Sequence, residues 1–425
     1  MKIKKKSSFK IFNDKVLSYI FLLLILLAVG IIFNDLNKYI DATTDTKNTE
    51  KVKEINISDI VNAYSEKIIT LRNANLYIYE NDSYMEIGHV IAASSFFLDL
   101  IEPTINDIYF KIKNTEYYVK YSDIMPVEDI VIDEHYKNYI PLNKNVTTDD
   151  KFVLYLNGKE YLSINESRTM PVIMLGNDEY FIEFNEQLMS IKSEDIVEET
   201  NANNTTKVEA TNIAVLNYHF FYDASKEVCN EPICLEKKAF ESQLKYLKDN
   251  GFYTLTMNDF NLWMDKKIRL PKKSVLITID DGAMGTDTHL IELLEKYDMN
   301  ATLFLITAWW KKSKYESPNL EVHSHGYDIH IAGTCGKAYK ALCMSKEALI
   351  ADFNKSKELV EDTTAFCYPF YAYNNTIIEA LKETGFKLGF IGGDKKANQS
   401  NDKYKIPRYV IYKWHQASDI MKMVN

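Results

Sequence analysis

The sequence predicts an α/β protein in which residues 213–425 form a distorted (β/α) barrel, preceded by a transmembrane anchor and two small β-rich modules. Strand-like and helix-like segments alternate over the barrel residues, which is the pattern of a parallel sheet. There are about seven such strands, and that number favours a barrel over an open sheet. One of them, Val275–Ile279, is apolar and carries no charge, as is typical of a strand buried on both faces.

The elements of the barrel are expected in the following order. Apolar, β-branched segments predict strands at 213–218, 275–279, 301–306, 320–324, 365–368, 387–391 and 406–412. Helical spacing predicts helices at 238–250, 289–297, 346–360 and 375–384. Because reactive groups in such a barrel lie at the carboxyl ends of the strands, a site is expected there.

The N-terminus has the features of a membrane anchor. Residues 1–15 contain six lysines, and residues 16–33 form an uncharged apolar run just long enough to cross a bilayer as a helix. The positive flank predicts a single-pass protein of the cell membrane, with the N-terminus in the cytoplasm and the barrel outside the cell. A cleaved signal peptide is the alternative, but the bulky Gly30–Phe33 segment offers no small-residue cleavage site.

The residues between anchor and barrel divide into linkers and modules: polar linkers at 34–54 and 199–212, and β modules at 55–130 and 131–198. The modules are rich in β-branched and aromatic residues, and an SH3-like fold would suit their size. A weak repeat relates 115–121 to 178–184, and an Asp-Ile pair follows each copy. Neither module carries a catalytic constellation, so we expect spacers or polymer-contacting units.

Composition excludes one class of partner and indicates a compartment. The chain has 50 Lys and Arg against 60 Asp and Glu, a formal charge of −10, so nucleic acid is not an expected partner. Two close pairs among the five cysteines, Cys229/Cys234 and Cys335/Cys343, fit local disulfides in an oxidising compartment. Cys367 remains and is expected to be a small buried core residue. No protein partner is indicated.

Two adjacent carboxylates, Asp280 and Asp281, follow the apolar strand at 275–279. Burying neighbouring anions is costly unless a cation compensates them. The pair is therefore a set of metal ligands, an acid/base pair, or a strand-ending turn, since Asp-Asp-Gly is also ordinary turn chemistry. This segment alone does not decide among the three.

A second candidate is the histidine-rich segment that follows the strand expected at 320–324. Three of the chain's eight histidines fall here: His323, His325 and His330. A single histidine would be interpreted as structural, whereas three together favour a metal site. Imidazole and carboxylate ligands without a nearby thiolate fit Zn²⁺ or a similar divalent ion with an open coordination position.

A third candidate is Tyr368–Phe370, where the strand at 365–368 ends on proline and leads into aromatic residues. Such an end is suited to present a backbone N–H and a flat surface to a sugar ring. Standing alone, it would be interpreted as a core strand terminated by proline.

Together these segments resemble the polysaccharide deacetylases, carbohydrate esterase family 4 (the NodB-homology domain). Thr278–Gly282 resembles the family's Thr-Phe-Asp-Asp-Gly motif, and Ser324–His330 and Tyr368–Phe370 resemble its second and third motifs. The i, i+5 histidine spacing is similar to that of the branch that de-N-acetylates poly-β-1,6-N-acetylglucosamine. Leu216–His219 and Ile406–Arg408 resemble two further strands of that branch, so the resemblance covers about residues 213–425.

The resemblance implies a role for each matching residue. Asp281, His325 and His330 would bind the metal, and Asp280 would stay free as general base. Arg408 would orient Asp280 through a charged hydrogen bond, although a salt bridge at the rim is the alternative for this arginine.

The third motif would supply substrate contacts through Tyr368, Pro369 and Phe370, with the backbone N–H of Phe370 stabilising the oxyanion. Phe370 replaces the tyrosine of the family, which leaves this backbone donor intact. Gly326 stands where the family usually has threonine, and we expect a looser second loop there.

The general acid is the gap in the resemblance, because the Leu-x-x-His strand of the chitin and peptidoglycan branches is not visible. His415 is the late candidate for this catalytic role. His323 is a rival metal ligand or acid, because it could share a strand face with His325. His219 is expected to be structural, at the edge of the site.

The resemblance therefore implies a metal-dependent hydrolase, with zinc as the expected metal, that removes acetyl groups from an extracellular N-acetylglucosamine polymer and releases acetate. Poly-β-1,6-N-acetylglucosamine is the first expected substrate and peptidoglycan the second. The alternative is a catalytically weak or inactive polysaccharide-binding or anchoring protein that keeps the fold. The intact carboxylates and histidines count against that alternative, and the missing acid counts for it.

Overall fold

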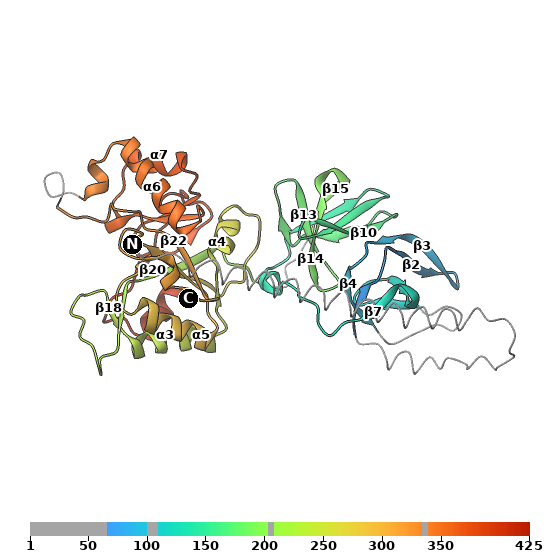
Figure 1. The fold of residues 1–425 in the computed structure, drawn as a ribbon, viewed down its shortest axis with the longest axis horizontal. Helices are drawn as coiled ribbons and strands as arrows, with labels where there is room; N and C mark the ends of the chain where they lie inside the picture. The colour runs from blue at the N-terminus through green and yellow to red at the C-terminus, as the bar shows by residue number, and fades with distance from the viewer. Residues whose placement is uncertain (1–65, 100–108, 203–207, 334–338) are drawn as a thin grey trace, which may run out of the picture. The chain divides into compact units, whose positions relative to one another are not determined.

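The structure, a computed structural model, describes residues 66–99, 109–202, 208–333 and 339–425. The anchor predicted at 16–33 lies outside these residues, as do the basic segment before it and the linker after it. Within the described ranges, no helix is long and apolar enough to cross a membrane. The described residues comprise a β-rich N-terminal region and a C-terminal α/β region (Figure 1).

The N-terminal region is built from antiparallel strands. One sheet has the order β12-β13-β14-β9-β10-β3-β2-β6-β5-β4-β1-β7, and a second has the order β11-β8-β15. Pairing of β10 with β3 joins strands from the segments at 55–130 and 131–198 into the larger sheet. The strands are β1 Lys67–Thr70, β2 Ala74–Glu80, β3 Ser83–Val90, β4 Ser95–Asp99, β5 Tyr109–Ile112, β6 Tyr117–Lys120, β7 Ile124–Pro126, β8 Lys144–Thr148, β9 Phe152–Leu156, β10 Lys159–Ile164, β11 Thr169–Pro171, β12 Met174–Leu175, β13 Glu179–Phe184, β14 Gln187–Lys192 and β15 Ile196–Asn201.

The internal repeat lies in a different register from the predicted one. In each copy a strand leads through one turn of 3-10 helix into another strand: β6, Tyr121–Asp123 and β7 in the first, β14, Ser193–Asp195 and β15 in the second. The Asp-Ile pair at 195–196 therefore corresponds to the pair at 123–124, and not to 129–130. Residues 115–121 and 178–184 contain β6 and β13, which resemble each other in sequence because alternating aromatic strands are alike whatever their place in the sheet.

The C-terminal region is a parallel sheet with the order β24-β23-β22-β21-β20-β16, to which β25 adds an antiparallel edge. Its last strand curls the sheet back on itself, because β26 pairs in parallel with β16 while Ile406 bridges Phe390 of β24. This arrangement is the predicted distorted barrel. The strands are β16 Asn212–Tyr218, β17 Phe220–Tyr222, β18 Cys234–Glu236, β19 Tyr253–Thr254, β20 Ser274–Asp281, β21 Ala301–Leu305, β22 Leu320–Ser324, β23 Ala365–Cys367, β24 Leu388–Phe390, β25 Ala397–Asn398 and β26 Tyr409–Val410.

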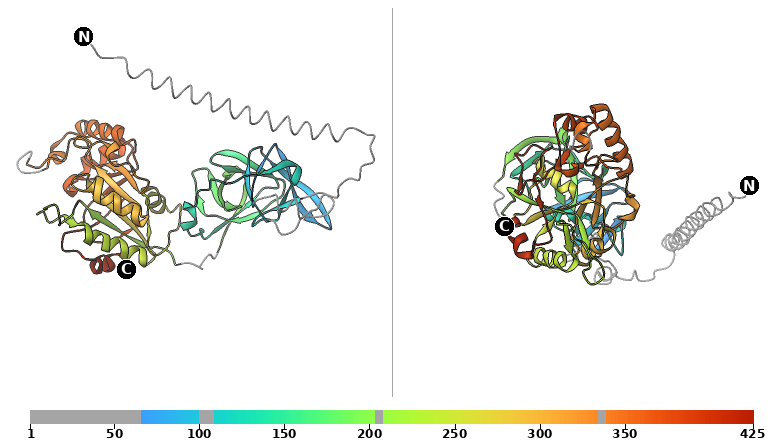
Figure 2. Two further views of the ribbon diagram at one scale, coloured as in Figure 1. Left: turned by 60° about the horizontal axis from the view of Figure 1, so that its bottom comes forward. Right: turned by 90° about the vertical axis from the view of Figure 1, so that its left-hand side faces the viewer.

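The helices of this region are α3 Lys237–Asp249, α4 Met257–Met264, α5 Ile291–Tyr297, α6 Lys346–Val360, α7 Asn375–Glu383 and α8 Ala417–Val424. Four of them were predicted, and α4 and α8 were not. Helix α4 begins with a capping box between Thr256 and Asp259, a signal that the sequence does contain. Helix α8 returns the chain to the side of α3 (Figure 2), where Asn425 donates to the hydroxyl of Tyr246 at 3.0 Å.

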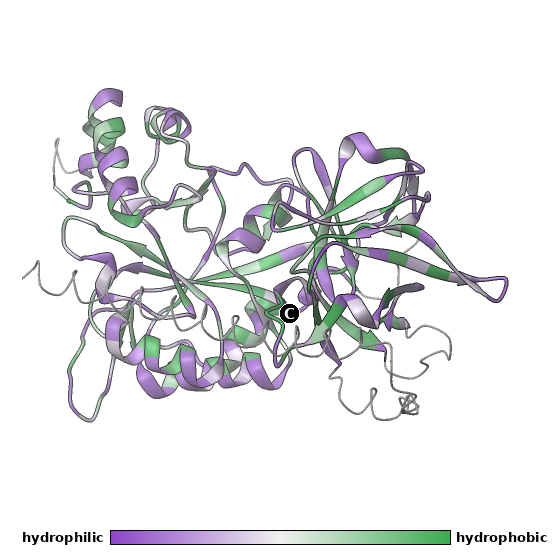
Figure 3. Ribbon diagram, turned by 45° about the vertical axis from the view of Figure 1, so that its right-hand side comes forward, coloured by the Kyte–Doolittle hydropathy of each residue, from purple (hydrophilic) through white to green (hydrophobic). Residues whose placement is uncertain are grey.

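Strand β20 is buried along its whole length, as predicted. Its odd-numbered residues Val275, Ile277 and Ile279 pack in one core cluster with apolar residues of α3 and α5, whereas Leu276 packs in another with Phe304. Because side chains alternate along a strand, Asp280 continues the Leu276 side. Figure 3 shows hydrophobic strands between helices that each have a hydrophilic side.

Cysteine usage agrees with the prediction as far as the described residues extend. Cys229 and Cys234 form a disulfide. Cys343 is also disulfide-bonded, while its predicted partner Cys335 lies outside the described residues. Cys367 is buried and free, but it lies beside the candidate site and not in an ordinary part of the core.

Candidate active site

The predicted residues gather at the carboxyl ends of neighbouring parallel strands. Asp280 and Asp281 end β20, His325 directly follows β22, and Cys367 ends β23. The loop after β22 brings His330 back to the same place. This is the end of the barrel at which reactive groups were expected.

Asp280 is held by a buried arginine. The Nη1 and Nη2 atoms of Arg408 donate to the two carboxylate oxygens of Asp280 at 2.8 Å each, and Nη1 also donates to Oγ1 of Thr278 at 3.1 Å. Both partners are buried, with Arg408 at 0% and Asp280 at 1% exposed. Burial alone would raise the pKa of Asp280, but the guanidinium outweighs it and holds that pKa far below its usual range. Asp280 is thus a fixed carboxylate.

Asp281 turns away from its neighbour, because its backbone adopts the left-handed conformation with φ of 75°. Its Oδ1 atom lies 3.4 Å from Nε2 of His325 and 3.3 Å from Nε2 of His330. Oδ1 is buried and has no hydrogen-bond partner. A buried carboxylate oxygen without a donor, facing two imidazole nitrogens, fits a divalent cation bound by all three groups.

The tautomer of His325 suits this role. Its Nδ1 atom donates to the carbonyl of Cys367 at 2.8 Å, so Nε2 is the atom that faces Asp281. Although burial opposes it, the contacts with Cys367 and Asp281 raise the pKa of this imidazole, and a cation bound there would replace the Nε2 proton. Burial lowers the pKa of His330 to about 4, so this second imidazole is neutral at neutral pH, as a metal ligand must be.

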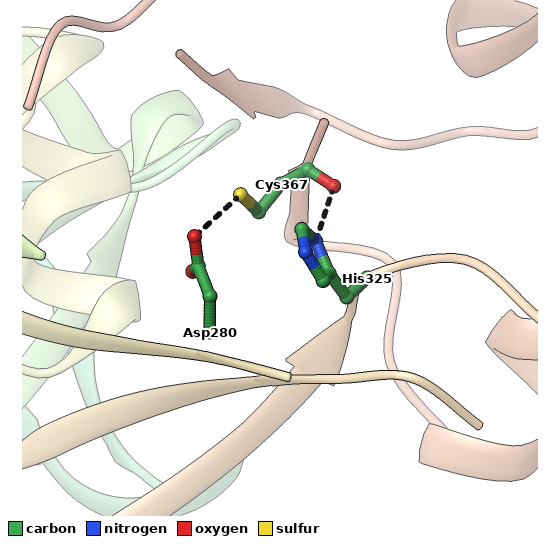
Figure 4. A group of neighbouring side chains, drawn as sticks. All are labelled: Asp280, His325 and Cys367. Atoms are coloured by element: carbon green, nitrogen blue, oxygen red, sulfur yellow. Dashed lines mark hydrogen bonds between the residues drawn. The ribbon is translucent and has the colours of Figure 1, made fainter. Parts of the chain in front are cut away.

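Asp280, His325 and Cys367 form a second group of possible ligands (Figure 4). Its atoms already bond to protein groups, because the Cys367 thiol contacts Oδ2 of Asp280 at 3.4 Å and accepts from Arg408 at 2.8 Å. Burial raises the pKa of the Cys367 thiol, which keeps it protonated. The group containing Asp281 is therefore the better metal site.

The third motif reaches the candidate site through one ring, that of Phe370. Tyr368 is 1% exposed, and its hydroxyl donates to the carbonyl of Tyr404 at 3.0 Å, so its side chain offers no surface to a sugar. Pro369 is buried as well. Phe370 has a left-handed backbone with φ of 56° and ψ of 18°, and its ring lies 4.2 Å from that of His330. No contact tests the predicted oxyanion role of the Phe370 N–H.

Three residues near Asp280 were missed or undervalued in the sequence. Asn217 donates to Oδ2 of Asp280 at 3.1 Å and to the hydroxyl of Tyr371 at 2.8 Å. His219 lies with Nε2 at 3.9 Å from that carboxylate and 3.5 Å from the Tyr371 hydroxyl. Its Nδ1 is buried without a partner, and burial lowers its pKa. The Leu216–His219 motif was the available signal, but it did not show that His219 faces the carboxylates.

The two other candidate histidines lie elsewhere. Nδ1 of His323 is 2.7 Å from Oδ1 of Asp362, so His323 is hydrogen-bonded away from the metal group. His323 was a candidate because it could lie on the same strand face as His325. Strand β22 ends at Ser324, so His325 is in the loop and the two histidines do not share a strand face. His415 accepts the backbone N–H of Tyr412 at 3.1 Å, and its catalytic role stays a prediction.

Comparison with known proteins finds deacetylases that are similar to about half of this chain. Residues 267–389 match the model of the polysaccharide deacetylase family. A poly-beta-1,6-N-acetyl-D-glucosamine N-deacetylase of Staphylococcus aureus (strain MSSA476) is 29% identical over 215 residues, covering 46% of this chain and 73% of the relative. An enzyme of the same name from Staphylococcus epidermidis is 28% identical over 241 residues, covering 49% of this chain and 82% of the relative.

Solved structures with a similar arrangement include IcaB from Ammonifex degensii, at 22% identity and a TM-score of 0.44, covering 52% of this chain and 99% of that one. The Streptococcus pyogenes deacetylase PplD in complex with acetate is 21% identical with a TM-score of 0.44, covering 52% and 100%.

Proposed function

We propose, since this chain carries a domain of the polysaccharide deacetylase family, that it removes the acetyl groups of poly-β-1,6-N-acetylglucosamine outside the cell with the help of a divalent metal ion. The domain is that of a hydrolase acting on carbon–nitrogen bonds. One observation carries the metal-dependent part of the proposal. It is the unpaired Oδ1 of Asp281 facing His325 and His330, beside a separate carboxylate fixed by Arg408.

The donor set of two imidazoles and one carboxylate fits zinc with an open coordination position. When bound there, such an ion supplies Lewis-acid chemistry, lowering the pKa of a water molecule and polarising the acetamide carbonyl. The ligands are Asp281, His325 and His330, and the carbonyl of Cys367 fixes the orientation of His325.

Asp280 is the group that accepts a proton as water attacks the acetamide carbon. Oδ2 of Asp280 already accepts from Arg408 and Asn217 and contacts the Cys367 thiol, whereas Oδ1 accepts from Arg408, so Oδ1 is the oxygen with a lone pair for a further donor. The backbone N–H of Phe370 stabilises the negative charge that develops on the acetamide oxygen. The carbon–nitrogen bond then breaks, acetate leaves, and the sugar nitrogen takes up a proton.

His219 is our candidate for the donor of that proton. Its Nε2 atom lies 3.9 Å from the Asp280 carboxylate, too far for direct transfer, so it would receive the proton taken from water through one bridging water molecule and pass it to the leaving amine. Burial keeps His219 neutral before the reaction, because it lowers the pKa of the imidazole. The same proton then serves both steps, and no late histidine is required.

One exposed aromatic ring beside the site supports a polymer substrate, and a second exposed ring lies on the segment that follows β26. The ring of Trp309 lies edge-on to His330 at 5.5 Å and is 52% exposed. Trp414 is 57% exposed and stacks on Tyr412 at 4.8 Å. Rigid aromatic faces with a polar edge are well suited to binding interfaces. The relatives' names favour the β-1,6-linked polymer over peptidoglycan.

The proposal also places the enzyme at the cell membrane through residues 16–33, with the barrel outside. The β-rich region would serve as a spacer between membrane and barrel. The alternative of an inactive polysaccharide-binding protein is weaker, because both carboxylates and both metal-facing histidines are present and lie close together.

The test is acetate release by the full-length protein from poly-β-1,6-N-acetylglucosamine and from peptidoglycan, with and without a chelator. We expect release from the first polymer, abolished by the chelator and restored by zinc. Release that persists in chelator would contradict metal dependence. Release from peptidoglycan alone would contradict the substrate assignment, and binding of either polymer without release would favour the alternative.

A further inference from the structure

The metal-facing loop is weakly held by its own backbone. His330 is at the apex of a three-residue turn, in which the N–H of Ile331 donates to the carbonyl of Ile329 at 2.8 Å. One such bond leaves considerable freedom to the residue at its centre. The position of His330 must therefore be fixed by packing and by contacts from other segments.

The beginning of the loop is fixed from helix α6 and by a glycine. Asp352 of α6 accepts the backbone N–H groups of Tyr327 and Asp328 at 2.8 Å each. Gly326 has φ of 83°, and a Cβ atom there would lie 2.5 Å from Cγ1 of the buried Ile329. The glycine that was expected to loosen the loop instead lets Ile329 pack closely. These contacts end just before His330.

The far side of the loop is fixed by Lys340. Its ammonium donates to the carbonyl of Asp328 at 2.7 Å and to the carboxylate of the same residue at 2.9 Å. Its backbone N–H donates to the carbonyl of Ile331 at 2.9 Å. These three bonds bracket His330, because they reach the chain two residues before it and one residue after it.

Tyr339, the residue before Lys340, reaches His330 through a stack of rings. The rings of Tyr339 and Phe370 are 4.2 Å apart and 10° from parallel. Phe370 in turn lies 4.2 Å from His330, tilted by 35°. The stack restricts rotation of the imidazole on one side and shields it from water.

We propose that Tyr339 and Lys340 act together as a clamp, the His330 clamp, whose role is to position this metal ligand. This inference depends on the proposed metal site. Lys340 bonds to Asp328 and Ile331, and Tyr339 stacks on Phe370, so we expect both to act on the metal through the position of His330. Outer contacts of this kind set the orientation of an imidazole and thereby the affinity for the metal.

The experiment measures the dissociation constant for Zn²⁺ in the full-length protein by competition with a chromophoric chelator. Lys340→Met removes the ammonium and keeps the aliphatic chain, and we expect affinity to fall about 10-fold. Lys340→Arg, which keeps a donor, should restore most of it. Tyr339→Ala should weaken affinity, whereas Tyr339→Phe, which keeps the ring, should not. If Lys340→Met fails to fold, the zinc affinities of Tyr339→Ala and Tyr339→Phe test the clamp in its place.

The matched control is Lys346→Met. Lys346 forms a 2.8 Å ion pair with Glu383 and is more exposed than Lys340, so its loss should leave zinc affinity unchanged. His330→Ala separates the two proposals. If it weakens zinc binding while Lys340→Met and Tyr339→Ala both bind as the parent does, the clamp is wrong and the metal site stands. If His330→Ala itself binds zinc like the parent, the metal site is wrong and the clamp falls with it.

Discussion

The two halves of the candidate site are held by different parts of the fold. Asp280 lies among buried side chains of barrel strands, where Arg408, Thr278 and Asn217 form a continuous hydrogen-bonded network with it. His330 lies on a loop whose contacts come from α6, Lys340 and Phe370. The barrel therefore sets the position of the proposed proton acceptor directly, whereas one of the proposed metal ligands, His330, depends on a loop that must itself be secured.

Breaking the barrel half should have the largest effect. Arg408→Met leaves the Asp280 carboxylate buried without its cation, and we expect the free energy of unfolding to fall by about 3–5 kcal/mol. Acetate release should be lost in the folded fraction. The measurement is denaturant unfolding of the variant beside the parent.

Arg72→Met is the control for that prediction. Arg72 also pairs with an aspartate, Asp123, at 2.8 Å, but its side chain is 68% exposed. An exposed pair should contribute less than about 1 kcal/mol. Equal losses in the two variants would show that burial of the Asp280 pair has no special consequence, contrary to our interpretation.

The next prediction concerns the proton donor on the barrel side. His219→Gln should lower kcat about 100-fold, because general acid catalysis contributes on that scale. His415→Gln should change kcat less than about threefold on the same scale. Steady-state acetate release measures both variants. A large loss of kcat in His415→Gln and none in His219→Gln would show that His415, as the sequence predicts, is the general acid.

A smaller effect is expected at His323, the histidine of β22. His323→Gln removes its pairing with Asp362 and should cost about 1–3 kcal/mol of stability without changing zinc affinity or kcat. Although burial opposes it, the bond to His323 lowers the pKa of Asp362 to about 2, below its usual 3.8. The pair therefore stabilises the fold above pH 3.8, and this contribution is lost as pH falls toward 2. Loss of zinc binding in the variant would restore His323 as a ligand.

The smallest effect is expected on the loop side, at the aromatic rim. Trp309→Ala should raise KM for the polymer about fivefold, since such ring contacts are worth about 1 kcal/mol, and leave kcat unchanged. Tyr79→Ala is the control, because Tyr79 is a similarly exposed ring, 45% exposed, on β2 in the N-terminal region. A change in kcat without a change in KM would mean that Trp309 supports His330 and does not contact the polymer.

Sequence reasoning went furthest where the fold is built from regular strands. The alternation of segments and the uncharged run at 275–279 predicted the barrel and the end at which the site lies. The motifs also brought Asp281, His325 and His330 to one place. The barrel and the end at which the site lies follow from local patterns, because strand ends in a parallel sheet meet at one edge, whereas the grouping of the three ligand candidates follows from the resemblance to the deacetylase motifs.

Contacts between segments far apart in the chain were beyond this reasoning. Cys367 was interpreted as plain core, although its carbonyl fixes His325 and its thiol contacts Asp280. Gly326 was expected to loosen its loop, but it allows Ile329 to pack closely, and nothing in the sequence shows this contact. Tyr339 and Lys340 fell outside every motif. Such side-chain contacts depend on the packed fold and leave no periodic signal.

The central claim is that two adjacent carboxylates have separate tasks. It is tested most directly by measuring zinc stoichiometry and acetate release in Asp280→Asn and Asp281→Asn side by side. We predict that Asp280→Asn keeps about one zinc per chain and loses acetate release, while Asp281→Asn loses the zinc as well. Acetate release at the parent's rate in Asp280→Asn, or full zinc binding in Asp281→Asn, would contradict the account.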